Sequence, residues 1–335
     1  MGAERKRPAI AIVGAGAIGG FVGGMLAEGG RTVRFLARCP TLDSLRDRGL
    51  HLTDYGGLDL RLTPDRLTAC ATPAEAFRGA DVILVCVKTA ATAAVAAEIA
   101  AHAPPQATVV SLQNGLAGLR QLRDGLPDRE VLAGMVPFNV VGDAAGHRHR
   151  ATSGTIQIGP DGREIARHLT VAGMPVECTP EIEAVQYGKL LINLNNALNA
   201  LSGLTLHRQL LDREWRRLMA DQMREALRVL RAHGIRARAT TPLPPGAVPF
   251  VLRLPTPLFR LIAAQMLTID PSARSSMAQD IAAGKKTEID ALQGEIIALG
   301  AEKSVPTPLA CAIRDAVLRA EREGCPHSAP QDLRP

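Results

Sequence analysis

The apolar positions in the first half of the chain follow two alternating patterns. Short, nearly continuous apolar runs are typical of strands that are buried on both faces of a parallel sheet, and the longer stretches between them have helical spacing. A strand followed by a helix, repeated along the chain, predicts a Rossmann-type doubly wound α/β sheet. The predicted strands are Ala9–Val13, Thr32–Ala37, Val82–Val87 and Thr108–Leu112, and the predicted helices are Ile18–Glu28, Thr89–His102 and Ala117–Arg123.

One segment of this half has a different pattern. Leu50–Tyr55 and Leu58–Leu62 alternate apolar and polar residues on either side of Gly56-Gly57. Alternation around a glycine pair predicts a β-hairpin inserted between the strands and helices of the main sheet.

After about Pro180 the strand signal fades and helical spacing continues to the end of the chain. We predict a largely apolar helix over Ala184–Leu201 and an amphipathic helix over Trp215–His233 that ends at Gly234. Six prolines in residues 242–257 predict a loop or broken connection. Further helices are predicted at Pro257–Ile269, at Ala273–Ala283, at Thr287–Leu299 and after Thr307-Pro308, where threonine would be the N-cap.

These patterns divide the chain into an α/β domain over residues 1–180, an all-α domain over residues 181–325 and a loose tail over residues 326–335. A length of 335 residues is sufficient for two cores. The net charge of +6 is spread along the chain, and the most basic stretch, Arg208–Arg238, is interleaved with acids. With only 3% aromatic residues, this stretch predicts a solvated helix face and no nucleic-acid partner.

Cysteine usage and hydropathy bear on the compartment. The six cysteines form no CxxC pair and no cluster with histidine, which predicts reduced thiols in a cytoplasmic protein and no metal site. No apolar segment reaches the roughly 20 residues that a membrane span requires, so we expect no membrane partner.

A glycine-rich motif of the form GxGxxG occupies residues 14–19, after the first predicted strand and at the start of the first predicted helix. In this context the first glycine permits a tight turn, the second lets the backbone approach a pyrophosphate, and the third lets the helix pack on the strand. The helix N-terminus presents N–H groups to the phosphates. We therefore predict dinucleotide binding by Gly14, Gly16, Ala17, Ile18 and Gly19.

The end of the second predicted strand indicates which dinucleotide is bound. An acidic residue here would bind the ribose 2′-hydroxyl of NAD. The chain instead has Arg38, with no acid nearer than Asp43. A guanidinium can donate two hydrogen bonds to a 2′-phosphate, so we predict NADP(H) as the cofactor. The alternative is that Arg38 is an ordinary surface residue.

Two polar residues follow the next two predicted strands. Lys88 comes directly after Val82–Val87, and Asn114 follows the strand that begins at Thr108. Because ligands of a doubly wound sheet bind outside the carboxyl ends of its strands, we predict that both residues line the cofactor site. Each residue alone is equally typical of a simple turn.

The predicted apolar helix over Ala184–Leu201 contains a lysine and four asparagines. With Lys189 placed at zero on a helical wheel, Asn193 lies at about 40° and Asn196 at about −20°. A buried ammonium is costly unless it is paired, so this stripe predicts a polar cavity. The alternative is that the asparagines make hydrogen bonds between helices.

Ser276 and Glu288 complete the set of candidates. The carboxylate of Glu288 can offset the charge of Lys189, although spacing alone does not bring the two together. By itself, Glu288 is equally typical of an acid at the start of a helix.

These motifs, in this order, resemble the ketopantoate reductase family (2-dehydropantoate 2-reductases) over nearly the whole chain. The matching residues are Gly14–Gly19, Arg38, Lys88, Asn114-Gly115, Ile158-Gly159-Pro160, Lys189 with Asn193, and Ser276 with Glu288. The resemblance implies NADPH-dependent reduction of a small 2-keto acid, with ketopantoate the first candidate and pantothenate biosynthesis the setting. It is also compatible with a homodimer formed through the helical domain.

The resemblance further implies individual roles. Lys189 would be the general acid that protonates the substrate carbonyl oxygen, and Glu288 would orient Lys189 or bind a substrate hydroxyl. Asn114, Asn193 and Ser276 would hold the substrate, and Lys88 would lie beside the cofactor. As hydride arrives at the carbonyl carbon, negative charge builds on oxygen, and a preorganised ammonium stabilises it.

One departure from the family pattern concerns the substrate. The family carries a second asparagine eight residues after the lysine, followed by proline, whereas this chain has Ala197 and Leu198. Asn196 lies one residue earlier and is the candidate replacement. Two alternatives stay open: a reductase or dehydrogenase of another keto or hydroxy acid, and a non-catalytic NADP-binding sensor. A sensor has no need for a general acid, which argues against the second.

Overall fold

The computed structural model describes residues 8–143, 145–240, 243–267, 271–324 and 328–334. The chain divides into two compact units, Met1–Ile182 and Glu183–Pro335.

The first unit is built on an eight-stranded sheet with the strand order β12-β11-β8-β7-β6-β1-β2-β5. The pairs from β5 to β8 are parallel, β8 and β11 are antiparallel, and β11 and β12 are parallel. The predicted doubly wound sheet is confirmed, with strands that end up to two residues earlier than expected. The strands are β1 (Ala9–Val13), β2 (Thr32–Leu36), β5 (Thr68–Cys70), β6 (Val82–Val85), β7 (Thr108–Ser111), β8 (Val131–Met135), β11 (Ile156–Ile158) and β12 (Val176–Cys178).

Each face of this sheet has its own apolar core. On β1, the side chains of Ile10 and Ile12 lie in one core, and those of Ala11 and Val13 lie in the other. Burial on both faces explains the continuous apolar runs of these strands. The helices of this unit are α1 (Ala17–Glu28), α2 (Thr41–Asp47), α3 (Pro73–Phe77), α4 (Thr92–His102), α5 (Ala117–Gly125) and α6 (Arg163–Leu169), and the 3-10 helix η2 (Thr89–Ala91) precedes α4.

The predicted hairpin is confirmed as β3 (Leu50–Asp54) and β4 (Asp59–Leu62), which pair antiparallel. It belongs to a second sheet of order β4-β3-β10-β9, completed by β10 (His147–Arg150) and β9 (Val140–Gly142). These last two strands were not predicted: the residues of β10 are all polar and give no apolar signal, and β9 is only three residues long.

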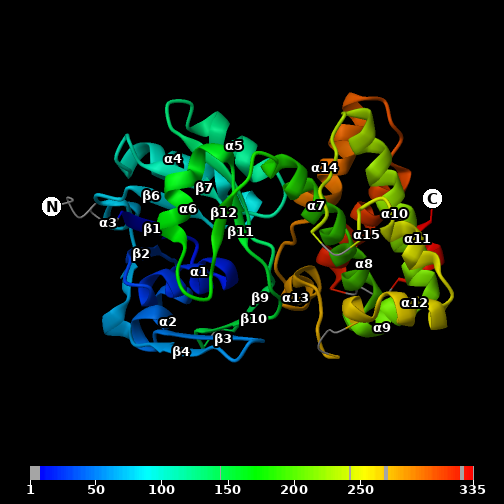
Figure 1. The fold of residues 1–335 in the computed structure, drawn as a ribbon, viewed down its shortest axis with the longest axis horizontal. Helices are drawn as coiled ribbons and strands as arrows, with labels where there is room; N and C mark the ends of the chain where they lie inside the picture. The colour runs from blue at the N-terminus through cyan, green and yellow to red at the C-terminus, as the bar shows by residue number, and fades with distance from the viewer. Residues whose placement is uncertain (1–7, 144, 241–242, 268–270, 325–327, 335) are drawn as a thin grey trace. The chain divides into compact units, whose positions relative to one another are not determined.

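Helix α1 packs against both sheets, as Figure 1 shows. A Cβ on Gly23 would lie 2.3 Å from the ring of Phe35 on β2, and a Cβ on Gly24 would lie 2.8 Å from Leu52 on β3. The glycines therefore allow close approach of the helix to a sheet on each side. This packing fixes the helix whose N-terminus lies within the glycine-rich motif.

The second unit is all α in its described residues, as predicted. Its helices are α7 (Ile182–Asn193, which begins in the first unit), α8 (Asn195–Ser202), α9 (Leu206–Leu211), α10 (Arg213–Ala232), α11 (Val248–Arg253), α12 (Thr256–Ile262), α13 (Ser276–Ala282), α14 (Ile289–Glu302) and α15 (Pro308–Glu323). Residues 268–269, where we predicted the end of a helix, lie outside the described residues.

The single helix predicted over residues 184–201 is interrupted at Leu194, between α7 and α8. The Leu194 carbonyl accepts a hydrogen bond of 3.0 Å from Nε2 of Gln293, which is fully buried on α14. A side chain that takes a carbonyl out of the helical ladder is a recognised cause of such a break. The break came from a contact distant in sequence, so local spacing did not reveal it.

Helix α10 confirms the predicted amphipathic helix, and Gly234 follows it with a φ of +71°. Helix α15 begins as predicted, with Thr307 at the N-cap and Pro308 in the first turn. Within the described residues, however, the Thr307 hydroxyl accepts no capping hydrogen bond. The buried carboxylate of Glu225 on α10 instead accepts hydrogen bonds from the backbone N–H groups of Leu309 (3.1 Å) and Ala310 (2.8 Å).

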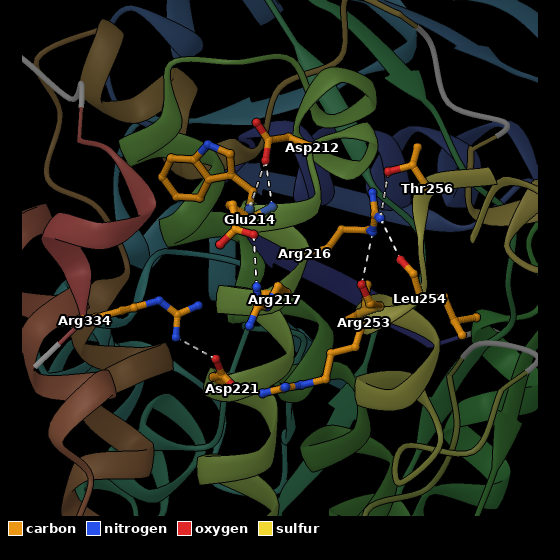
Figure 2. A network of polar contacts seen from close by, with 11 residues as sticks. Asp212, Glu214, Arg216, Arg217, Asp221, Arg253, Leu254, Thr256 and Arg334 are labelled. Carbon is orange, nitrogen blue, oxygen red and sulfur yellow. Dashed lines mark hydrogen bonds and ion pairs between the residues drawn. The ribbon is translucent and has the colours of Figure 1, made fainter. Parts of the chain in front are cut away.

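The described part of the proline-rich segment, residues 243–257, includes the short helix α11 and the start of α12 and is therefore not a plain loop. Arg216 on α10 anchors them (Figure 2). Its guanidinium donates to the carbonyls of Leu252 (3.1 Å) and Leu254 (3.0 Å) and to the Thr256 hydroxyl (3.2 Å). Arg216 is 1% exposed. The expectation that the whole basic stretch is a solvated face is therefore wrong for Arg216, whose charge is satisfied by these acceptors.

The described part of the predicted loose tail, residues 328–334, is packed against the helical unit. It forms the 3-10 helix η5 (Pro330–Leu333), with Leu333 buried. The Ser328 N–H donates to the Leu201 carbonyl (2.9 Å), and Arg334 pairs with Asp221 on α10 (2.9 Å; Figure 2). The prediction of a loose tail was based on its prolines and did not take into account that Leu333 can be buried. Among the described residues, no helix is long and apolar enough to cross a membrane.

Candidate functional site

The strand register places four of the predicted site residues beyond one edge of the main sheet. Val13 on β1 is level with Leu36 on β2 and with Val85 on β6, and Val85 is level with Ser111 on β7. The chain leaves these four strands toward Gly14, Arg38, Lys88 and Asn114, respectively. Strand order reverses between β1 and β6, which is the point where open α/β sheets bind ligands.

The three motif glycines each meet a different steric requirement. Gly14 has a φ of +93°, and a Cβ there would lie 2.7 Å from Val87. A Cβ on Gly19 would lie 2.1 Å from the Gly14 carbonyl oxygen. Gly16 has no described atom within 4 Å of its Cβ position. The middle glycine thus faces open space, as expected if a ligand is to approach the backbone.

Helix α1 starts at Ala17, and Gly16 is its N-cap residue. Because glycine has no side chain to bond the first N–H groups, these remain available to an anion at the positive end of the helix dipole. Ala17 and Ile18 form the first turn and are half-buried. The loop and helix start therefore fit the pyrophosphate of a dinucleotide.

Arg38 follows β2 and is exposed over 79% of its side chain. Its guanidinium lies 3.4 Å from the carboxylate of Glu98 on α4. Exposed ion pairs contribute little, about 0–1 kcal/mol, so this contact does not prevent Arg38 from binding a phosphate.

Lys88 is exposed and Asn114 is half-buried at the same edge. Thr89, next to Lys88, has a buried hydroxyl with no hydrogen-bond partner among the described residues. An orphaned hydroxyl at this edge fits a polar ligand. Thr89 was not among the predicted site residues, because a single threonine forms no pattern in the sequence.

Gln113 was missed as well, although it holds this edge together. Its Nε2 donates to the Val87 carbonyl (2.9 Å) and to the Thr92 hydroxyl (2.7 Å), while its Oε1 accepts from Ser111 (3.2 Å). Gln113 is buried. It therefore ties the turn that carries Lys88 to the end of β7, where Asn114 follows. Its position directly before Asn114 was the only signal in the sequence.

In the second unit, α7 carries Lys189 in a half-buried position. Desolvation lowers the pKa of Lys189 to about 8, and the negative charge of Glu288 acts in the opposite direction. In the structure, Glu288 is therefore close enough for its charge to act on Lys189, a proximity that could not be predicted from sequence spacing. Glu288 is the half-buried N-cap residue of α14, but the Thr287 hydroxyl accepts the hydrogen bond from the Ile289 N–H.

Gly188, directly before Lys189, is required by a close approach of the chain. The Arg238 N–H donates to the Ala184 carbonyl (2.8 Å), so the segment around Arg238 crosses α7. A Cβ on Gly188 would lie 1.8 Å from the Arg238 carbonyl oxygen. This crossing helps to fix the backbone that carries Lys189.

The asparagines of α7 and α8 divide into two groups. Asn195 and Asn199 are buried and bond Gln209 on α9, with Gln209 Nε2 donating to Asn195 at 3.0 Å and Asn199 Nδ2 donating to Gln209 at 3.1 Å. Asn195 and Asn199 therefore make hydrogen bonds between helices, which was the alternative to a polar cavity. Asn193 and Asn196 are half-buried, and their side chains make no hydrogen bond within the described residues. They remain suited to a ligand.

Ser276 is exposed at the first position of α13. Its neighbour Ser275 is buried and fixes the helix start, because its hydroxyl donates to the Asn196 carbonyl (3.0 Å) and its N–H donates to Asn199 Oδ1 (2.8 Å). Ser275 also caps α13 by accepting from the Ala278 N–H (3.2 Å). Because Ser276 follows Ser275 directly, it is held beside α8, near Asn196.

The fold and these residues define a dinucleotide-binding oxidoreductase with a helical second unit. Residues 10–162 match the family model described as "Ketopantoate reductase PanE/ApbA", and residues 181–321 match its C-terminal counterpart. The chain belongs to the ketopantoate reductase family, whose members are NADP-dependent oxidoreductases that act on a keto or CH–OH group.

Individual relatives agree with this assignment. The chain is 26% identical over 324 residues to a 2-dehydropantoate 2-reductase of Halobacterium salinarum, covering 94% of this chain and 99% of that protein. It is 31% identical to the solved structure of a PanE/ApbA family ketopantoate reductase from Ralstonia eutropha, with a TM-score of 0.80 over 94% and 99% of the two chains. A D-mandelate dehydrogenase solved with NADH and anilino(oxo)acetate has the same fold at 20% identity, with a TM-score of 0.80 and coverage of 94% and 99%.

Proposed function

We propose that this protein uses NADPH to reduce a small 2-keto acid to the 2-hydroxy acid, with 2-dehydropantoate (ketopantoate) as the first candidate. The observation that carries the proposal is a half-buried lysine, Lys189, whose pKa lies at about 8 under the opposing influence of Glu288. A lysine with such a pKa is charged at neutral pH and still releases a proton readily, as a general acid must.

In this proposal the sheet edge of the first unit holds the cofactor. The backbone of Gly14, Gly16, Ala17, Ile18 and Gly19 receives the pyrophosphate, for the steric reasons given above. Arg38 binds the 2′-phosphate, and Lys88 and Asn114 lie along the cofactor. NADPH supplies the hydride that reaches the carbonyl carbon of the substrate.

Lys189 does the acid chemistry. Its ammonium donates a hydrogen bond to the substrate carbonyl oxygen, stabilises the negative charge that develops there and transfers a proton to it. The negative charge of Glu288 favours the charged form of Lys189 before the transfer. Asn114, Asn193, Asn196 and Ser276 hold the keto acid by hydrogen bonds to its polar groups.

The test is NADPH oxidation by the purified protein with a panel of 2-keto acids that includes ketopantoate, pyruvate and phenylglyoxylate. We expect turnover with at least one member and the highest kcat/KM with ketopantoate. Absence of turnover with every member would contradict the proposal.

Cofactor choice is tested separately by Arg38→Ala. The parent is expected to bind NADPH at least about tenfold more tightly than NADH, a difference of about 1.4 kcal/mol. The variant should lose this preference while its affinity for NADH stays unchanged. Equal affinities of the parent for NADPH and NADH would contradict the proposed role of Arg38 in binding the 2′-phosphate.

A second candidate within the same reaction class is a different 2-keto acid. Ala197 and Leu198, where the sequence departs from the family pattern, are both fully buried. They present no polar group to a substrate hydroxyl, so recognition of one falls to Asn196. The panel decides between the two candidates, because a preference for an acid without a distal hydroxyl favours the second.

We also propose a homodimer formed through the helical unit. Phe250, Leu258, Leu261 and Ile262 on α11 and α12 are large apolar residues exposed to solvent. A fold relative from Staphylococcus aureus is itself named as a dimeric ketopantoate reductase. Sedimentation of the parent should give twice the mass of the chain, and Leu261→Glu should halve it. A monomeric parent would refute this proposal.

A further inference from the structure

A buried arginine lies against the glycine-rich loop. Arg148 on β10 is 5% exposed. Its guanidinium donates to the carbonyl oxygen of Gly16 (Nε, 3.1 Å) and reaches that of Ala15 (3.5 Å). It also donates to two further carbonyls, both at 2.8 Å. One belongs to Asp143, which precedes β10, and the other belongs to His147, the first residue of β10. One side chain thus joins the second sheet to the loop that precedes α1.

Two glycines make room for this side chain. A Cβ on Gly20 of α1 would lie 3.0 Å from Arg148 Nε, and a Cβ on Gly142 of β9 would lie 2.9 Å from Arg148 Cδ. Both distances are tighter than ordinary van der Waals contacts. Side chains at either position would crowd the guanidinium away from the loop carbonyls.

The contacts to Ala15 and Gly16 determine the direction of two N–H groups. In a trans peptide group the carbonyl and the N–H of the next residue point in opposite directions. The Gly16 carbonyl also accepts the first hydrogen bond of α1, from the Gly20 N–H (2.9 Å), so Arg148 is its second donor. Arg148 accordingly helps to hold the peptide groups 15–16 and 16–17 with their carbonyls toward itself. The N–H groups of Gly16 and Ala17 then point away from Arg148, and the Gly16 Cβ position has no described atom of another segment within 4 Å.

Arg148 differs from the other buried arginines in what it contacts. Arg150, two residues along the same strand, forms an ion pair with Asp54. Arg216 is satisfied by carbonyls of the helical unit, remote in sequence from any predicted site residue. Arg148 makes no ion pair within the described residues, and the Asp143 carboxylate acts on it only through its charge. Its positive charge therefore lies directly behind the loop that is to bind an anion.

We propose that Arg148 is a positioning residue for the cofactor pyrophosphate. It orients the N–H groups of Gly16 and Ala17 toward the phosphates and adds a fixed positive charge behind them. The inference rests on the proposed cofactor site at residues 14–19, and it assigns to the second sheet a part in cofactor binding.

The experiment compares Arg148→Met and Arg148→Lys with the matched control Arg150→Lys, which alters the neighbouring buried arginine on the same strand. Each protein is titrated with NADPH by fluorescence. It is also titrated, by competition, with adenosine 2′-monophosphate, which lacks the pyrophosphate. Thermal melting of each variant reports stability separately.

We expect Arg148→Met to raise the Kd of NADPH by roughly tenfold or more, the usual size of a lost charge-assisted contact. The Kd of adenosine 2′-monophosphate should change little, and Arg150→Lys should change neither. Should the methionine variant not fold, Arg148→Lys decides, because lysine keeps the charge but lacks the planar fork. A rise of about threefold or more in its NADPH Kd supports the proposal.

An unchanged Kd of NADPH in a folded Arg148 variant, with only a lower melting temperature, would overturn the proposal and make Arg148 purely structural. Equal weakening by Arg150→Lys would overturn it as well. Failure of the parent to bind NADPH would instead refute the cofactor site itself, so the two failures are distinguishable.

Discussion

Replacing Glu288 by glutamine tests the electrostatic link between α14 and α7. The carboxylate favours the charged form of Lys189 and raises its pKa, against the larger effect of desolvation. Glutamine keeps the size of the side chain and removes its charge. The pKa of Lys189 should therefore fall below about 8 in Glu288→Gln, because desolvation then acts without its main opposing influence.

The size of the effect follows from the protonated fraction of Lys189. With a pKa of about 8, the parent is charged in about 90% of molecules at pH 7 and in about 9% at pH 9. If the carboxylate contributes about 1.4 kcal/mol, the pKa falls by about one. The charged fraction at pH 8 then drops from about one half to about one eleventh, which is about a fivefold loss in rate for a step that requires the acid form.

The assay is kcat/KM for the keto acid, measured against pH at saturating NADPH. In the parent, kcat/KM should fall above about pH 8, and in Glu288→Gln the fall should begin at lower pH. Asp290→Asn is the matched control. It removes a charge two residues further along the same chain segment, from an exposed residue that pairs with Arg314. If the two variants give the same pH profile as the parent, Glu288 is only an acid at the start of a helix.

Four further variants separate ligand contacts from structural ones. Asn196→Ala should lower kcat/KM roughly tenfold at an unchanged melting temperature, whereas Asn195→Ala should lower the free energy of unfolding by about 1–3 kcal/mol and leave kcat/KM nearly unchanged. If instead Asn196→Ala lowered the stability in urea and Asn195→Ala lowered kcat/KM, Asn195 would be the ligand contact and Asn196 the structural one. Glu225→Ala should cost about 2–3 kcal/mol in urea unfolding, because it leaves two buried N–H groups at the start of α15 without acceptors; a cost below 0.5 kcal/mol would refute this cap. Gly188→Ala should cost about 1–3 kcal/mol by displacing the crossing segment at Arg238, and a parent-like melting temperature would show that the crossing is adaptable.

Much of the fold was predictable because its signals are local. The continuous apolar runs of β1, β6 and β7 report burial on both faces, and alternation around Gly56-Gly57 reports a hairpin with one buried face. The elements that were missed depend on distant partners. Two of the polar residues of β10 are satisfied by such partners, because Arg148 donates to the Gly16 carbonyl before α1 and Arg150 pairs with Asp54 on β3.

The site was predictable where residue type and chain position coincide. The glycine-rich motif and Arg38 fall at strand ends, and the register then places them at one edge. Residues that only support the site gave no such signal. Gln113 and Ser275 are ordinary polar residues in sequence, and their importance follows from hydrogen bonds to segments 21 and 79 residues away. Among the asparagines, sequence could not separate the buried Asn195 from the half-buried Asn196.

The most direct test of the account is single-site replacement of the proposed general acid. Lys189→Ala should lower kcat by roughly 10²–10⁴-fold with the preferred 2-keto acid, the usual range for loss of a positioned proton donor. The Kd of NADPH should remain that of the parent, because the proposed cofactor residues lie on the first unit. Turnover at the parent rate in this variant would contradict the central claim and leave Lys189 a structural residue of α7.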